Sequence, residues 1–111
     1  METKELIKEF AVIGDRVKHS LSPVLHNEVF RQLSLNAKYS KQFVDKNNLN
    51  NFISNFLKSN YNGFNVTIPH KKTIINKCDE LNLRAVEIGA VNCVLNKNKK
   101  LWGFNTDWFG F

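Results

Sequence analysis

Short apolar segments of strand length alternate along this chain with segments of helical spacing. Five segments have the length and apolar content of strands: residues 8–13, 37–44, 64–68, 90–95 and 101–104. Four segments between them have helical spacing or helix-start residues: 22–33, 49–57, 69–78 and 81–88. This alternation predicts an α/β fold in which helices pack on the faces of one sheet.

Two of the expected helices carry an apolar stripe. The first begins with Ser22 as N-cap and Pro23 at the first helical position. Its apolar residues recur about every four positions: Val24, Leu25, Val29, Phe30 and Leu33. The second is capped by Asn47 or Asn48, and its apolar residues follow the i, i+3, i+4, i+7, i+8 spacing of a helix face: Leu49, Phe52, Ile53, Phe56 and Leu57.

Glycine and proline residues divide the remaining elements. We expect Gly14 to end the first strand, Asn62-Gly63 to break the chain before the third strand, and Pro69 to open a helix that reaches about Cys78. The last two strands are joined by a basic turn at residues 97–100. Because so short a turn cannot make a parallel crossover, these two strands are predicted to run antiparallel.

Composition limits the class of protein. The chain has 111 residues, of which 42% are hydrophobic and 23% charged, which is typical of one globular domain. No apolar run approaches the roughly 18 residues that span a bilayer, and the first residues carry no apolar signal core. We therefore expect a cytoplasmic protein that does not bind a membrane.

The net charge of +6 leaves three readings open: compositional bias, attraction of a small anion, and binding of nucleic acid. The lysines are spread along the chain, and their only dense cluster lies in the expected hairpin turn at residues 97–100. Most aromatic residues have core spacing instead of alternating with lysines. No nucleic-acid partner is therefore expected, and a non-catalytic basic binding module remains a remote alternative.

Cysteine, histidine and glycine usage argues against a disulfide scaffold, a metal site and a phosphate loop. Cys78 and Cys93 form no CxxC pair and are expected to be reduced, inert thiols. His19, His26 and His70 lack metal-ligand spacing and are expected to be structural. The chain contains no GxGxxG or GxxxxGK[ST] loop. A nucleotide cofactor, if one is used, is not bound by such a fingerprint here.

Polar segments follow the expected strands, where ligands bind in open α/β sheets. There are four of them: residues 14–23, 65–71, 90–92 and 103–107. Together they supply hydroxyls, amides, one ammonium group and one carboxylate. This set suits a small polyhydroxylated acid better than a metal ion, a phosphate or stacked bases.

Each of the charged or hydroxylated candidates also has a simpler structural interpretation. Ser20 and Ser22 lie at the positive end of a helix, where they either hold a carboxylate or serve only as caps. Lys71 is either a solvated lysine or an ammonium group held over a pocket. Asp107 is either a helix-start carboxylate or the partner that orients Lys71. Spacing alone does not decide among these interpretations.

Taken together, the four segments resemble the substrate-binding domain of the shikimate dehydrogenase family. Residues 14–27 (GDRVKHSLSPVLHN) are similar to the family's N-terminal signature, and residues 63–71 (GFNVTIPHK) to its catalytic-lysine signature. Residues 89–94 (GAVNCV) and 103–111 (GFNTDWFGF) match the third and fourth blocks. The blocks occur in family order across essentially the whole chain.

This resemblance implies an enzyme that reduces 3-dehydroshikimate to shikimate with NADPH, or a related quinate or dual-specificity dehydrogenase. Two serines, Ser20 and Ser22, would hold the substrate carboxylate. Four side chains would bind the ring hydroxyls: Asn65, Thr67, Asn92 and Asp107. Lys71 would be the catalytic lysine and would also contact the substrate, with Asp107 beside it.

The resemblance also implies the architecture: a three-layer α/β/α domain with a mostly parallel sheet and one antiparallel strand. Residues 1–104 would form the substrate-binding domain, and residues 105–111 would begin a helix leading to an NADP-binding domain that this chain lacks. We therefore expect the chain by itself to be inactive. The sequence does not determine its oligomeric state.

Overall fold

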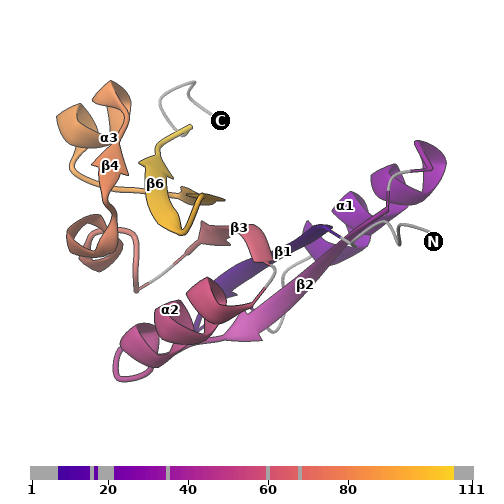
Figure 1. Ribbon diagram of the computed structural model, residues 1–111, viewed down its shortest axis with the longest axis horizontal. Helices are drawn as coiled ribbons and strands as arrows, with labels where there is room; N and C mark the ends of the chain where they lie inside the picture. Colours follow the sequence, from indigo (N-terminus) through magenta and orange to yellow (C-terminus); the bar gives the residue numbers. More distant parts are fainter. Residues whose placement is uncertain are drawn as a thin grey trace.

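The computed structural model describes residues 8–15, 17, 22–34, 36–59, 61–67 and 69–106. Its strands are β1 (Lys8–Gly14), β2 (Ala37–Phe43), β3 (Tyr61–Val66), β4 (Glu80–Leu81), β5 (Cys93–Lys97) and β6 (Lys100–Phe104). Its helices are α1 (Ser22–Gln32), α2 (Leu49–Lys58), α3 (Leu83–Ile88) and a 3₁₀ helix, η2 (Thr73–Lys77). Figure 1 follows these elements along an elongated molecule of 45 × 28 × 28 Å, with α1 and α3 at opposite ends.

The six strands form one mixed sheet in the order β2-β1-β3-β5-β6-β4. The strand β5 pairs antiparallel with both β3 and β6, whereas the pairings β1–β2, β1–β3 and β4–β6 are parallel. Five strands therefore share one direction and β5 alone opposes them. This confirms the predicted mostly parallel sheet with one antiparallel strand.

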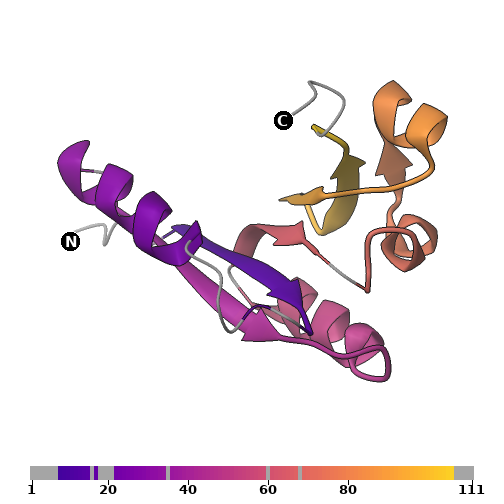
Figure 2. The ribbon, with the colours of Figure 1, turned by 180° about the vertical axis from the view of Figure 1, so that it is seen from behind.

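Helices cover both faces of the sheet, as the reverse view in Figure 2 also shows. Successive residues of a strand point to opposite faces. Ala11 and Ile13 of β1 therefore belong to the larger core, together with Ile53 and Phe56 of α2. Val12 belongs to the smaller core on the other face, against which Phe30 of α1 packs. We call these two sides the α2 face and the α1 face.

Aromatic rings stabilise the α2 face. Phe52 and Phe56 of α2 meet Phe64 of β3 edge-on, with ring centroids 5.1 and 4.9 Å apart. Burial of an aromatic side chain contributes about 1.5–3 kcal/mol, and an edge-to-face pair adds about 0.5–1.5 kcal/mol. The apolar stripe predicted for this helix is confirmed: its members are buried or partly buried in the larger core.

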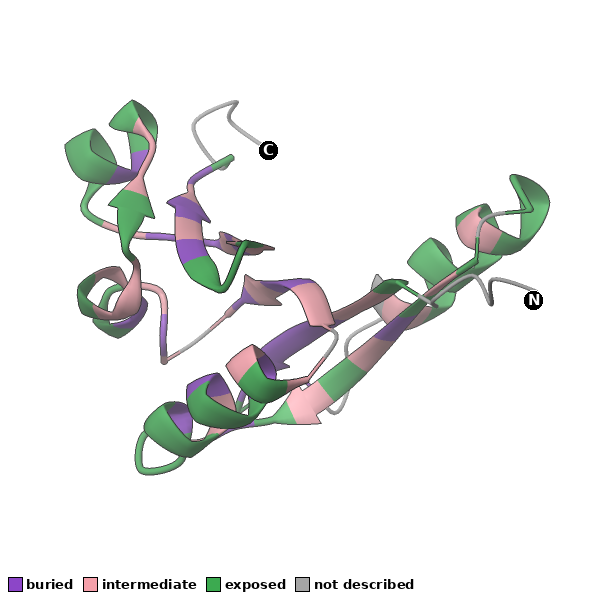
Figure 3. Ribbon diagram, in the orientation of Figure 1, coloured by how far each residue is buried: buried purple, intermediate pink, exposed green. Residues whose placement is uncertain are grey.

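Of the five apolar residues expected to form a stripe on α1, only Phe30 packs on the sheet. Val24, Leu25, Val29 and Leu33 are between 51% and 66% exposed, and α1 is mostly green in Figure 3. The side of α1 that meets the sheet instead carries His26, Asn27 and Phe30. The helix predicted from this spacing is confirmed, but apolar spacing identifies a helix face and not what that face contacts.

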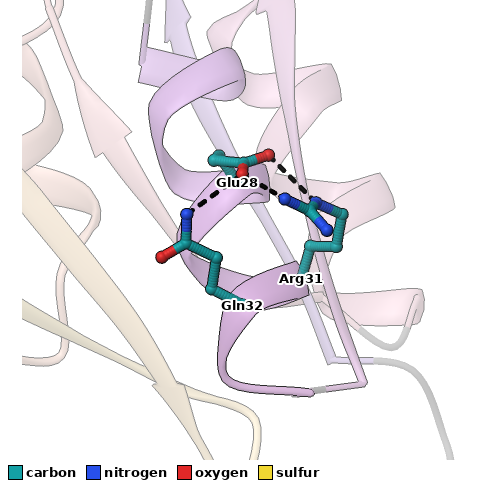
Figure 4. Close-up of polar contacts among 3 residues, drawn as sticks. All are labelled: Glu28, Arg31 and Gln32. Atoms are coloured by element: carbon teal, nitrogen blue, oxygen red, sulfur yellow. Dashed lines mark hydrogen bonds and ion pairs between the residues drawn. The ribbon is translucent and has the colours of Figure 1, made fainter.

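Three polar side chains contact one another near the C-terminal end of α1. Arg31 pairs with Glu28, and Gln32 donates to the same carboxylate over 3.1 Å (Figure 4). The Arg31 guanidinium, and then the Gln32 amide, hold the pKa of Glu28 below its usual range. Because these side chains are exposed, the cluster adds little to the stability of the domain.

Several boundaries differ from the sequence prediction. The short strand β4 (Glu80–Leu81) lies where the helix over residues 81–88 was expected to begin, and β5 begins at Cys93 instead of residue 90. Asn62 and Gly63 lie inside β3 and do not break the chain. A Cβ atom on Gly63 would lie 2.8 Å from the Val94 carbonyl oxygen, so this glycine serves the close approach of β5. The helix expected from Pro69 is instead a turn followed by η2, which begins at Thr73. Among the described helices, none is long and apolar enough to cross a bilayer.

Candidate active site

Because β5 runs opposite to its neighbours, three polar segments meet at one end of the strands, the end where β3 and β6 finish. Asn65 pairs with Cys93, and Cys93 pairs with Phe104. Because β5 is antiparallel, its beginning lies beside the carboxyl ends of β3 and β6. Asn92, which immediately precedes β5, therefore lies between the segments that follow β3 and β6.

Asn92 joins these segments through hydrogen bonds. Its side chain is 9% exposed; Oδ1 accepts from the Thr106 backbone N–H over 3.1 Å, and Nδ2 donates to Thr106 Oγ1 over 2.9 Å. Its backbone carbonyl accepts from the Val66 N–H (2.9 Å) and from Asn65 Nδ2 (3.3 Å). Asn92 thus fixes both the end of β3 and the residue that precedes Asp107.

Lys71 lies in the turn between β3 and η2 and is half-buried. Its backbone carbonyl accepts from the Val91 N–H over 2.8 Å, which ties the lysine's backbone to the segment that contains Asn92. The structure therefore gathers Asn65, Lys71 and Asn92 at the carboxyl edge of the sheet. Thr67 lies on the same connection, where its N–H donates to Ile13 and its carbonyl accepts from His70.

The buried His70 side chain fixes the turn that carries Lys71. Its side chain is 1% exposed, and its Nε2–H donates to the carbonyl oxygen of Val44, just beyond β2. Its own carbonyl accepts from the Ile74 N–H over 2.9 Å. The buried ring thus joins the turn that carries Lys71 to the end of β2. His70 has the structural role expected from the sequence.

Asn65 has a neighbour that sequence reasoning missed. The hydroxyl of Tyr39 donates to Asn65 Oδ1 over 2.7 Å from the other side of β1. Burial raises the pKa of Tyr39 to about 12, and the Cys93 thiolate adds to the shift, so the hydroxyl keeps its proton at neutral pH. Both residues border a cavity of ≈ 240 Å³ on the α1 face.

Several predicted site residues cannot be placed in this geometry. Ser20 and Asp107 lie outside the described residues, as does His19. Ser22 opens α1, as the sequence predicted, but its side chain is not among those described. Within the described ranges, no group of three or more His, Cys, Asp or Glu residues could hold a metal ion.

Comparison with known proteins assigns the chain to a family. The family model described as the shikimate dehydrogenase substrate binding domain matches residues 12–94, most of the chain. The chain belongs to this family. The family assignment agrees with the resemblance carried by the four sequence blocks.

Known shikimate dehydrogenases are similar to this chain in both sequence and structure. A shikimate dehydrogenase (NADP(+)) of Bacillus cereus is 44% identical over 102 residues, which are 92% of this chain and 37% of that protein. The shikimate dehydrogenase structure from Aquifex aeolicus has a TM-score of 0.91 at 41% identity, covering 99% of this chain and 41% of that one. The Thermus thermophilus shikimate 5-dehydrogenase in complex with shikimate gives a TM-score of 0.88 at 36% identity, covering 94% of this chain and 40% of that one. The chain therefore spans less than half the length of these relatives.

Both cysteines of this domain are free and half-buried. Burial raises the pKa of the Cys78 thiol to about 11, with the Asp79 carboxylate adding to the shift, and burial also raises the pKa of Cys93. Because the thiolate is the reactive form, we expect iodoacetamide at neutral pH to alkylate both cysteines more slowly than in the urea-unfolded chain, Cys78 by at least about tenfold. Mass-spectrometric time courses measure this, and equal rates in the two states would contradict it.

Proposed function

We propose that this chain is the substrate-binding domain of an NADP-dependent shikimate dehydrogenase that reduces 3-dehydroshikimate to shikimate. The observation that carries the proposal is the hydrogen-bonded cluster of Asn65, the Lys71 backbone, Asn92 and Thr106 at the carboxyl edge of the sheet. It supports a site for a small polyhydroxylated acid. The names of the relatives favour shikimate over quinate as that acid.

The substrate would be held by its carboxylate and its hydroxyls. Ser20 and Ser22, beside the start of α1, would bind the carboxylate. Four side chains would bind the ring hydroxyls: Asn65, Thr67, Asn92 and Asp107. Each hydrogen bond to the charged carboxylate contributes about 1.5–3 kcal/mol, and each neutral one about 0.5–1.5 kcal/mol. A handful of such bonds would orient the ring above Lys71.

Lys71 would act on the ketone. Reduction adds a hydride, which NADPH supplies when bound, to the carbonyl carbon. The electron pair of the C=O π bond moves to the oxygen, which takes a proton. An ammonium group at that oxygen stabilises the developing negative charge and can donate the proton. Asp107 would keep the lysine charged and oriented.

NADP would be bound by a further domain of the protein. The chain has no glycine-rich dinucleotide loop and covers 37–39% of its curated relatives, which are named as NADP(+) enzymes. We infer that residues 1–104 form the substrate-binding domain and that residues 105–111 begin the helix leading to the cofactor domain. A cytoplasmic location and the absence of nucleic-acid partners stay predictions.

A titration of the isotope-labelled chain with shikimate tests the proposed site. We expect selective amide shifts at Asn65, Thr67, Lys71 and Asn92, because these residues lie on one edge of the sheet. Acetate, a carboxylate without ring hydroxyls, is expected to leave them unchanged, and quinate to bind more weakly. If shikimate shifts none of these amides, either in the chain or in the complete protein, the site assignment is wrong.

A further inference from the structure

On the α1 face of the sheet, a tyrosine side chain reaches across one strand to a residue that we propose binds the substrate. Tyr39 pairs with Phe10 of β1, and Asn65 pairs with Val12. Because paired residues share a face and alternate residues do too, Tyr39 and Asn65 project from the same face on opposite sides of β1. The Tyr39 hydroxyl covers the remaining gap and lies 2.7 Å from Asn65 Oδ1.

The helix α1 contacts both the ring and the backbone of Tyr39 and so holds it in this position. The ring of His26 stacks on the Tyr39 ring, with centroids 4.4 Å apart and planes 15° from parallel. Asn27 binds the backbone: its Nδ2 donates to the Tyr39 carbonyl (2.7 Å), and its Oδ1 accepts from the Tyr39 N–H (2.8 Å). These contacts occupy the edge of β2 at this residue. Tyr39, 5% exposed, is therefore fixed in both backbone and ring.

The two contacts of Asn65 define which way its amide faces. Nδ2 donates to the Asn92 backbone carbonyl, which can only accept, and Oδ1 accepts from the Tyr39 hydroxyl. A reversed amide would bring two acceptors together at Asn92. In the observed orientation, the second N–H of Asn65 donates to no acceptor in the described part of the chain.

We propose that Tyr39, held by His26 and Asn27, is a positioning residue that orients the Asn65 amide so that its second N–H is presented to a ring hydroxyl of the substrate. This inference rests on the proposed function, since it assumes that Asn65 binds that substrate. Tyr39 itself touches no reacting atom. Its effect is on substrate affinity through Asn65.

Tyr39→Phe in the complete enzyme tests this role, because it removes the hydroxyl and keeps the ring that stacks on His26. We expect the KM for shikimate to rise about three- to tenfold, the range of one lost hydrogen bond, with kcat and the KM for NADP within about twofold. Tyr61→Phe is the matched control. The Tyr61 hydroxyl also binds an amide side chain, accepting from Gln42 over 3.2 Å at the other end of β3. The KM of the Tyr61→Phe enzyme for shikimate is expected to stay unchanged.

A double-mutant cycle separates positioning from general packing. If Tyr39 acts through Asn65, then Tyr39→Phe raises the KM no further in an Asn65→Ala background. An equal rise in both backgrounds would overturn the proposal, as would an unchanged KM in Tyr39→Phe alone. Melting temperatures of all variants exclude an effect of partial unfolding on the measured KM.

The side-chain amide resonances of Asn65 give a readout that needs no substrate. They are expected to shift in Tyr39→Phe and not in Tyr61→Phe; no shift in either variant would overturn the orienting role. A wild-type enzyme that neither binds nor oxidises shikimate would refute the proposed function, while these resonances would still show whether the Tyr39 hydroxyl orients the Asn65 amide.

Discussion

Replacing Lys71 by alanine is expected to lower the kcat of the complete enzyme about 10³-fold. General acid catalysis contributes about 10²–10⁴-fold, and a charge aimed at a developing oxyanion contributes a similar factor. The turn that carries Lys71 is fixed by the bond from Val91 and by the buried His70. Alanine keeps those backbone contacts. The loss should therefore fall on the chemical step, measured as NADPH oxidation with saturating 3-dehydroshikimate.

Lys72→Ala is the control for Lys71→Ala. Lys72 is the next residue of the same turn and is exposed, so its replacement changes the net charge equally without removing the proposed catalytic group. We expect its kcat to stay within about twofold of wild type. If Lys71→Ala retained more than about a tenth of the wild-type kcat, or if both variants lost activity equally, Lys71 would not be the catalytic lysine.

Except for β4, the order of elements followed from local sequence patterns, and so did the end of the sheet at which we propose the site. A period of two or of 3.6 residues is set by a few neighbours, and so is a helix cap, which explains why β1, α2 and the β5–β6 hairpin were predicted well. The direction of β5 followed from the shortness of the turn at residues 97–100. That direction in turn places Asn92 beside the carboxyl ends of β3 and β6.

Features that depend on distant partners were not predictable in the same way. The pair Asn62-Gly63 was interpreted as a break because this dipeptide is typical of turns, yet here Gly63 admits the Val94 carbonyl of a strand about 30 residues later. The Tyr39–Asn65 bond crosses β1 and depends on the register of two strand pairs. The only local signal was the pair His26-Asn27 in the first sequence block, whose contact with Tyr39 no spacing rule predicts.

The second large effect is expected from Asn92→Ala. This change removes both side-chain bonds to Thr106 and so releases the residue before Asp107. Displacement of a catalytic group by about 1 Å can cost about 10²-fold in rate. The change also removes the bond proposed between Asn92 and a ring hydroxyl, so we expect kcat/KM for shikimate to fall by at least about 10²-fold. The lost hydrogen bonds should also lower the free energy of unfolding by about 1–3 kcal/mol. Steady-state kinetics and urea denaturation measure the two effects.

Asn96→Ala distinguishes loss of site geometry from loss of stability. Asn96 lies at the other end of β5 and also makes two side-chain bonds, to the Tyr61 carbonyl (3.2 Å) and from the Lys99 N–H (3.0 Å). Its replacement should destabilise the domain by a similar amount, about 1–3 kcal/mol, while kcat/KM stays near wild type. Equal losses of kcat/KM in both variants would mean that activity follows the stability of β5. In that case, Asn92 would have no separate role in binding the substrate or in holding the segment that leads to Asp107.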